Sequence, residues 1–283
     1  MSECREASTP MEPGMVLSKQ MSPKTQSERL EAAKFPYREL VGTLLYLSTH
    51  TRIDIAYTVS QLSRFMDSHG SGHHKAALHC LRYLKGTVDK GVTYGTDKSE
   101  QLIGFSDSDW AKCIDTGRSV TGYVFYLGGG PITWTSKTQP TVAQSSTEAE
   151  LMAATFTSKE AVHLRQLCYD LKIDCDDPTI ICEDNQGAIA LSLNPVFHER
   201  TKHIRVKYFY VRECVQEGEV KLHYVRTDKQ LADVLTKATS KGIFVDMVDT
   251  LMGNTGLEYW FSDSTEHGEI EFYDDESDGN DSD

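Results

Sequence analysis

The chain has 283 residues, 39% of them hydrophobic, which is enough for one substantial core and a smaller unit beside it. Its seven cysteines are an odd number without a C-x-x-C pair, so they argue against a disulfide framework and a zinc ribbon. No apolar run approaches the ~18 residues of a membrane span, and the N-terminus has no signal-peptide core. The sequence therefore predicts an intracellular protein that is not secreted and has no membrane partner.

The net charge of −13 at first argues against a nucleic-acid partner, because Lys and Arg dominate phosphate binding. Ten of the acids, however, lie between Phe261 and Asp283, a stretch without Lys or Arg. Subtracting these ten charges from the total of −13 leaves −3 on the rest of the chain. A metal-dependent nuclease also clusters carboxylates, so this mild acidity does not exclude a polyanion whose charge cations bridge.

The first third of the chain divides into a polar and a helical part. Residues 1–35 contain three prolines and no sustained apolar period, which predicts a disordered linker or the severed edge of a larger polymerase region. Residues 36–95 turn helical, with apolar side chains at i, i+3, i+4 spacing. We expect three packed helices there, at about 37–48, 55–65 and 73–84.

Residues 96–252 combine strand-like and helical patterns, which predicts an α/β domain of mixed α+β type with a five-stranded mixed sheet flanked by helices. The long helix is expected to open with a capping box from Thr147 to Glu150. Residues 253–283 are expected to form a disordered acidic tail. The expected strands are 101–106, 120–127, 131–136, 179–183 and 219–225, and the expected helices are 147–171, 185–193, 203–217 and one from about 229.

Four acids lie at the edges of these elements: Asp107 ends the first strand, Glu150 lies in the first turn of the long helix, Asp184 ends the fourth strand, and Asp233 lies in the last helix. Ends of adjacent strands lie side by side, so these side chains can converge. Carboxylates this close repel one another unless divalent cations lie between them, and an all-oxygen set suits Mg²⁺. A single Asp at a strand end is more often a turn former or a helix cap, so spacing alone leaves both interpretations open.

Seven sequence words occur in order between about residues 36 and 252. Together they resemble the C-terminal part of copia-type LTR retrotransposon Pol polyproteins, where a reverse transcriptase connection precedes the ribonuclease H domain. The resemblance implies a ribonuclease H-like fold for 96–252, a helical connection subdomain at 36–95, and a chain that is a fragment of a longer polyprotein. The words are PYRELVGTLLYLSTHTRIDIAY (36–57), HCLRYLKGT (79–87), FSDSDWA (105–111), SVTGYVFYLGGGPITWTSKTQPTVAQSSTEAELMAA (119–154), EDNQGAIAL (183–191), RTKHIRVKYFYVRE (200–213) and QLADVLTK (230–237).

The resemblance also implies an activity. Asp107, Glu150, Asp184 and Asp233 match the family's D-E-D-D metal set, with Asp109 as the rival for the first position. The family's enzymes cut the RNA strand of RNA–DNA hybrids with two Mg²⁺ ions, for which Mn²⁺ can substitute, during reverse transcription. The implied partners are the hybrid and the polymerase part of the polyprotein, in a cytoplasmic virus-like particle or the nucleus. A catalytically silent hybrid-binding or scaffolding remnant is the alternative, and the oligomeric state stays open.

Further residues of the same words are candidates for nucleic-acid contacts. Asn185 and Gln186 could meet the minor groove, where 2′-hydroxyls identify RNA, although helix capping explains them equally well. Ser146 and Thr147 offer a helix N-terminus to a phosphate, again with capping as the alternative. His203 lies at an expected helix start, where a histidine is more often structural. The candidates for phosphate contacts are Lys137, Lys202, Arg205 and Lys237.

Overall fold

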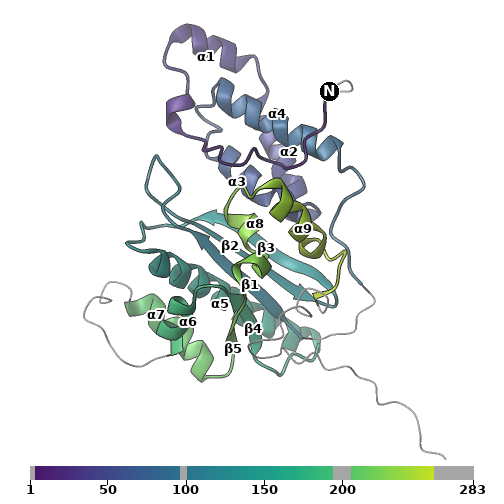
Figure 1. Ribbon diagram of the computed structural model, residues 1–283, viewed down its shortest axis with the longest axis vertical. Helices are drawn as coiled ribbons and strands as arrows, with labels where there is room; N and C mark the ends of the chain where they lie inside the picture. Colours follow the sequence, from purple (N-terminus) through teal and green to yellow (C-terminus); the bar gives the residue numbers. More distant parts are fainter. Residues whose placement is uncertain (1–3, 96–100, 194–204, 258–283) are drawn as a thin grey trace, which may run out of the picture.

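A helical unit lies against one end of a five-stranded sheet in the computed structural model of the chain (Figure 1). The structure describes residues 4–95, 101–193 and 205–257. Two of the predicted site residues, Lys202 and His203, lie outside the described residues, as does the acidic stretch from residue 258 onward.

The predicted disorder of the N-terminal segment is wrong, because residues 4–35 pack along the helical unit. They include the turn η1 (Lys19–Met21) and the helix α1 (Gln26–Ala33), which a capping box between Thr25 and Glu28 begins. Met11 and Leu17 are buried in the main core. The sequence did not predict this order, because only two buried apolar side chains and a helix cap stabilise the segment, and these produce no periodic apolar pattern.

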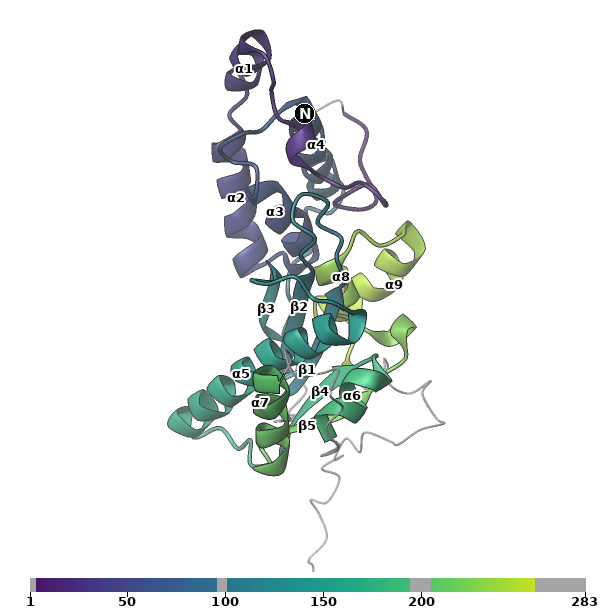
Figure 2. The same ribbon diagram turned by 90° about the vertical axis from the view of Figure 1, so that its left-hand side faces the viewer.

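The helical unit consists of α2 (Tyr37–His50), the turn η2 (Ile53–Ile55), α3 (Ala56–Ser63) and α4 (Ser71–Lys85). These bounds match the three expected helices. The apolar stripe of each helix faces the others, as the spacing predicts, so that Val41, Leu44, Val59 and Leu62 are fully buried. Figure 2 shows the three helices side by side above the sheet.

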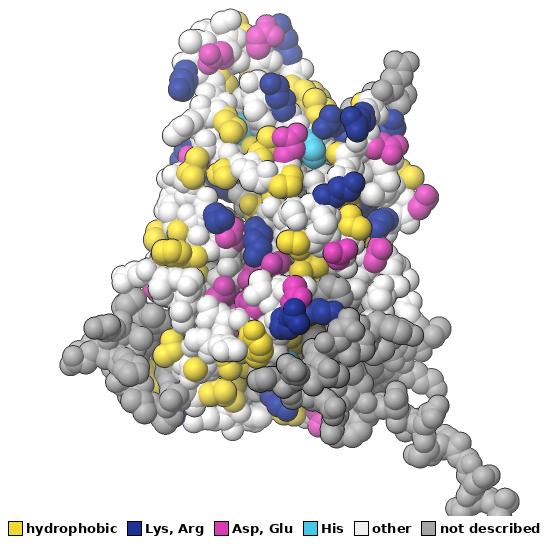
Figure 3. All heavy atoms as spheres, in the orientation of Figure 1, with side chains coloured by type: hydrophobic (Ala, Val, Ile, Leu, Met, Phe, Trp, Pro, Cys, Tyr) yellow, Lys and Arg dark blue, Asp and Glu magenta, His cyan; other side chains and the backbone are white. Residues whose placement is uncertain are grey.

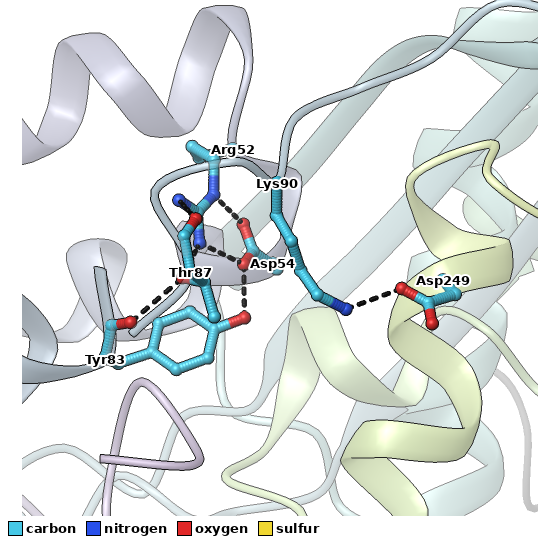
Figure 4. Close-up of polar contacts among 6 residues, drawn as sticks. All are labelled: Arg52, Asp54, Tyr83, Thr87, Lys90 and Asp249. Carbon is cyan, nitrogen blue, oxygen red and sulfur yellow. Dashed lines mark hydrogen bonds and ion pairs between the residues drawn. The ribbon is translucent and has the colours of Figure 1, made fainter. Parts of the chain in front are cut away.

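A buried ion pair holds the helical unit together (Figure 4). Arg52 donates from Nε to Asp54 Oδ1 at 3.0 Å and from Nη2 to Asp54 Oδ2 at 2.8 Å. The Tyr83 hydroxyl donates to the same carboxylate, and Arg52 Nη1 donates to the Thr87 carbonyl at 2.9 Å. Both charges are therefore met by partners inside the protein, which a buried pair requires if it is not to destabilise the fold.

The sheet has the order β3-β2-β1-β4-β5, in which β1 is antiparallel to β2 and parallel to β4, and β5 is parallel to β4. This confirms the predicted five-stranded mixed sheet. The strands are β1 (Ile103–Asp109), β2 (Val120–Leu127), β3 (Gly130–Thr138), β4 (Thr179–Glu183) and β5 (Val220–Tyr224).

Helices cover both faces of the sheet, with α5 and α7 on one side and α8 and α9 on the other (Figure 2). Neighbouring residues of a strand therefore enter different cores: Phe105 and Val124 join the core on the α8 side, and Phe125 joins the core on the α5 side. The expected final helix divides into the turn η4 and two helices. The bounds are α5 (Ser146–Leu171), α6 (Gln186–Leu193), α7 (Arg205–Gln216), η4 (Thr227–Lys229), α8 (Asp233–Thr236) and α9 (Lys241–Leu251).

One core joins the helical unit to the sheet. Its buried residues run without interruption from α2, α3 and α4 to β1, β2, α8 and α9. Polar contacts cross the same boundary: Trp134 Nε1 donates to the Ser48 carbonyl at 2.7 Å, and Lys90 Nζ lies 2.6 Å from Asp249 Oδ1 (Figure 4). The predicted division into a connection subdomain and a sheet domain therefore describes two parts of a single packed body.

Candidate metal centre

Three of the four predicted acids converge at one end of the sheet. Asp107 in β1, Glu150 in α5 and Asp184 directly after β4 each contribute one carboxylate oxygen, and these oxygens all lie within 4.8 Å of one another. Asp107 and Glu150 are buried, with 3% and 7% of their surface exposed, and Asp184 is half-buried. Strand-end placement therefore brings these side chains together, as the sequence predicts.

The strands β1 and β4 stop pairing before they reach Asp107 and Asp184. Their ladder ends at the pair Phe105–Cys182, and the buried Gln230 fills the space beyond it. Its Nε2 donates to the Ser106 carbonyl at 2.9 Å and to the Cys182 carbonyl at 3.3 Å. Sequence reasoning missed Gln230, because a side chain that bonds two strands more than forty residues away leaves no local signal.

The start of α5 differs from the prediction and explains how Glu150 reaches the site. The cap is Ser145, whose Oγ accepts from the Glu148 amide at 3.1 Å, and not Thr147. Glu148 Oε2 in turn accepts from the Gln144 amide at 2.7 Å. Glu148, and not Glu150, thus makes the side-chain contacts at the start of α5, and Glu150 lies among the other carboxylates.

Asp233, the fourth predicted acid, borders this group from α8. Close packing of α8 on β2 needs Gly122, where an added Cβ would lie 2.7 Å from Thr236 Cγ2. The Thr236 hydroxyl donates to Asp107 Oδ2, and Asp233 Oδ1 lies 2.7 Å from Lys237 Nζ. Lys237, predicted to contact phosphate, thus contacts a carboxylate of the site in this structure.

Asp109, the rival of Asp107, has a different environment. We expected Asp107 to end the first strand, but β1 continues to Asp109. Asp109 Oδ1 lies 3.7 Å from Lys112 Nζ and does not belong to the three-carboxylate group. Asp107, and not Asp109, therefore lies with Glu150 and Asp184.

Glu183 is a fifth acid at the site that sequence reasoning missed. It is fully buried at the end of β4, and its Oε1 accepts from the Asn185 amide at 3.1 Å. Burial, and then the charge of Asp107, raise the pKa of Glu183 well above its ordinary value. An acid that closes the otherwise apolar strand TIICE was the available signal.

Burial and close approach of the carboxylates raise pKa values at the site. Burial raises the pKa of Asp107, which the charge of Lys237 opposes. Burial and the charges of the neighbouring acids, Glu183 first, raise the pKa of Glu150. Burial and the charge of Asp107 raise the pKa of Asp233 to about 7, although Lys237 opposes this. In the described part of the chain, Glu150 Oε2 and Glu183 Oε2 are buried without a hydrogen-bond partner. Unmet oxygens in an all-oxygen set fit the binding of a divalent metal ion.

The predicted nucleic-acid contacts near α6 lie beside this centre. Asn185 Oδ1 accepts from the Ala188 amide at 3.0 Å, so Asn185 caps α6, as the alternative interpretation held. Gln186 is exposed at the first position of α6. A Cβ built at Gly187 would lie 3.6 Å from Thr147 Oγ1, which places the starts of α5 and α6 next to each other.

The other candidates are more dispersed. Ser146 is exposed in the first turn of α5, and Lys137 is exposed on β3. Arg205 is the first residue of α7. The space-filling view of the face with α8 and α9 shows acidic and basic side chains side by side near its middle (Figure 3).

No protein-family model matches the chain. The chain is 41% identical over 244 residues to a retrovirus-related Pol polyprotein from transposon TNT 1-94 of Nicotiana tabacum, a match that covers 86% of this chain and 18% of that polyprotein. It is 43% identical over 208 residues to a retrovirus-related Pol polyprotein from transposon RE2 of Arabidopsis thaliana, covering 74% of this chain and 14% of that one. The chain thus spans less than a fifth of the length of these relatives.

Among solved structures, LC11-RNase H1 isolated from compost is 16% identical, with 51% of this chain and 99% of that one covered and a TM-score of 0.38. The sequence relationship to the polyproteins extends over most of the chain and includes the β1, α5 and β4 segments that carry the three carboxylates. The chain is therefore a sequence relative of the copia-type, retrovirus-related Pol polyproteins, and it has the five-stranded mixed sheet with flanking helices that the sequence predicts.

Proposed function

We propose that the chain is a ribonuclease H that cuts the RNA strand of RNA–DNA hybrids by metal-dependent phosphodiester hydrolysis. One observation carries the proposal: carboxylate oxygens of Asp107, Glu150 and Asp184 lie within 4.8 Å of one another. Such a group is costly without a ligand, because burial disfavours each charge and the charges repel one another. Two divalent cations would remove this cost, and hard oxygen ligands favour Mg²⁺, with Mn²⁺ as a substitute.

The chain's own residues would position the reacting groups. Asp107, Glu150 and Asp184 would hold the metal ions, with Asp233 at the border of the set. When bound, two Mg²⁺ ions would activate a water molecule and neutralise the leaving oxygen. The Thr236 hydroxyl fixes the orientation of Asp107, and Gln230 keeps the ends of β1 and β4 apart. These contacts preorganise the carboxylates before substrate arrives.

The substrate would lie across the adjoining starts of α5 and α6. Free amides at a helix N-terminus attract phosphate, and Ser146 and Thr147 lie in the first turn of α5. Gln186 is exposed beside them and could reach a minor groove, where the 2′-hydroxyls distinguish RNA from DNA. Lys137 and Arg205 are the proposed contacts to phosphates farther along the duplex.

A catalytically silent hybrid-binding or scaffolding remnant is the second candidate. The observation that favours it is the contact of Lys237 Nζ with Asp233 Oδ1 at 2.7 Å. An internal cation bound to the fourth carboxylate competes with a metal ion for the same oxygen. The matched relatives are several times longer than the chain, so the polymerase part of such a polyprotein is the proposed partner.

The location of the protein stays a prediction from sequence: inside the cell, in cytoplasmic virus-like particles or the nucleus. Within the described residues, every helix is too short or too polar to cross a membrane.

The test is cleavage of a labelled RNA–DNA hybrid by the purified chain in Mg²⁺ or Mn²⁺, with duplex DNA as the control substrate. We expect cleavage of the hybrid alone. Asp184→Asn should abolish it without a change in far-ultraviolet circular dichroism, because the half-buried Asp184 is a ligand rather than part of the core. Binding of the hybrid without cleavage by the wild-type chain would favour the silent remnant. Cleavage that persists in Asp184→Asn would refute the assignment of the site.

A further inference from the structure

A cavity beside the carboxylates is lined by cations from three separate parts of the chain. It has a volume of 80 Å³ and lies between the N-terminal segment, α3, the residues after β1 and the residue that follows α8. Arg64, Lys112 and Lys237 line it, together with a single acid, Asp109. The excess of positive charge makes the cavity suited to an anion.

Lys112 and Arg64 keep capacity for a ligand, whereas Lys237 is already paired with Asp233. Lys112 Nζ lies 3.7 Å from Asp109 Oδ1, and the side chain of Lys112 is 63% exposed, so it can turn toward a ligand at little cost. Arg64 Nη2 donates to the Cys113 sulfur at 2.8 Å and lies 3.5 Å from Asp115 Oδ2. Its guanidinium therefore lacks a close bidentate carboxylate, the partner that would neutralise it best.

A buried amide donor in the same cavity lacks a partner. Gln61 is 6% exposed, and its Oε1 accepts from Arg64 Nη1 at 2.6 Å. Its Nε2 has no hydrogen-bond partner among the residues that the structure describes. A buried donor without a partner destabilises the fold, so its presence at a cationic cavity indicates an acceptor that binds there.

Tyr57, whose side chain carries a second neutral donor, also lines the cavity. Burial, and then the charge of Asp109, raise the pKa of Tyr57 to about 12, so the hydroxyl keeps its proton at neutral pH. Two neutral donors and three cations form a set that matches the several oxygens of a phosphate group.

We propose that this cavity binds a backbone phosphate of the nucleic-acid strand, next to the phosphate at the carboxylates. The inference rests on the proposed function, because it assumes a strand at the metal centre. Continuity supports it: Lys237 lines the cavity and contacts Asp233, and Asp109 lines it two residues after Asp107. A strand held at the carboxylates therefore has the cavity beside it. The helical unit, through Gln61 and Arg64, becomes part of the substrate-binding surface.

Two matched lysines provide the test. Lys112 and Lys34 are both exposed, at 63% and 69% of their side chains, and each pairs with an acid three residues earlier. Only Lys112 lines the cavity. Hybrid binding is measured by fluorescence anisotropy at several salt concentrations in an Asp184→Asn background, so that no strand is cut. We expect Lys112→Gln to weaken binding about three- to tenfold and to reduce the slope of log Kd against log salt by about one, with Lys34→Gln changing neither.

Gln61→Glu tests the amide independently of the lysines. A carboxylate at position 61 still accepts from Arg64, so the fold should be kept, and circular dichroism checks this. The substitution replaces the unmatched donor with a negative charge, and we expect a loss of hybrid affinity of about tenfold or more. Equal affinities and salt slopes for Lys112→Gln, Lys34→Gln and their common background would overturn the proposal, and so would an unchanged Kd in Gln61→Glu.

Cleavage by the wild-type active site, measured separately, distinguishes this inference from the proposed function. If the wild type cleaves the hybrid but Lys112→Gln does not change the affinity, the phosphate site is refuted and the proposed function is not. Affinity that depends on Lys112 without any cleavage supports the site and refutes the nuclease. Inorganic phosphate is the last probe. Suppose that it raises the Tm of wild type but not that of Lys112→Gln, and that Lys112→Gln leaves the Kd for the hybrid unchanged. The cavity then binds free phosphate, and its assignment to the nucleic-acid strand is wrong.

Discussion

The buried charges around Arg52 and those around Asp107 are arranged in opposite ways. In the helical unit, Arg52 donates twice to Asp54 and Tyr83 donates to the same carboxylate, so the acid is matched inside the protein (Figure 4). At the end of the sheet, Asp107, Glu150 and Asp184 face one another, and buried oxygens are left without partners. The first cluster serves the fold, whereas the second lowers stability until something binds.

The matched cluster should be the more sensitive to loss of one member. In Arg52→Met the buried Asp54 loses both donated bonds, and we expect the free energy of unfolding to fall by about 3–5 kcal/mol. Urea denaturation measures the change. Arg38→Gln is the control, because it breaks an exposed pair with Asp67, and its effect should stay under about 1 kcal/mol. Equal effects of the two substitutions would show that Asp54 is not held as the structure describes.

The unmatched cluster should respond to cations instead. Mg²⁺ at about a hundred times its Kd should raise the free energy of unfolding by about 2.7 kcal/mol, because the native state alone assembles the three carboxylates. Thermal unfolding with and without EDTA measures this. Asp184→Asn should lose most of the response. A similar gain in both proteins would mean that Mg²⁺ acts elsewhere.

The same cluster predicts a dependence on pH in metal-free protein. The pKa of Glu150 is raised in the folded state, and that of Asp233 is raised to about 7, so the native state holds more protons than the unfolded chain. Stability should therefore be greatest near pH 4 and should fall as the pH rises toward 7. In Glu150→Gln the fall should be smaller, and stability at pH 7 should rise by about 1 kcal/mol. A wild-type profile that is flat over this range would contradict the electrostatics described here.

The exposed contact between the two regions should matter least. Lys90 and Asp249 join the helical unit to α9, but their side chains are 34% and 51% exposed. Lys90→Met should change the free energy of unfolding by less than about 1 kcal/mol, measured by urea denaturation. A loss as large as that in Arg52→Met would mean that this contact, rather than the shared core, holds the two regions together.

Local patterns in the sequence predicted most of this architecture. Period-two and period-3.6 spacing located the five strands and the helices of the core, because both patterns record which side chains are buried. The same reasoning placed Asp107, Glu150 and Asp184 together, since strand and helix ends fix them. The N-terminal segment was missed because few of its side chains are buried, and Met11 and Leu17 alone carry no period.

Contacts between distant residues were beyond such patterns. Gln230 bonds β1 and β4, and Thr236 bonds Asp107, yet neither residue differs in its neighbourhood from an ordinary helix residue. The cap of α5 was placed two residues late, because several hydroxyl and acid residues compete within Gln144–Glu150 and only the structure shows which pair is made. Glu183 could have been recognised as an acid at a strand end, but the metal-site assignment was given to its neighbour Asp184.

The core shared by α2, α3, α4, β1, β2, α8 and α9 limits how the molecule can be divided. A recombinant protein that started at the first strand would lose the partners of Phe244, whose ring packs against Tyr83, and of Trp134, whose Nε1 donates to the Ser48 carbonyl, and would expose apolar surface there. Such an exposed surface promotes aggregation. Exchange of the sheet domain between relatives would therefore succeed only if the preceding helices were transferred with it as one module.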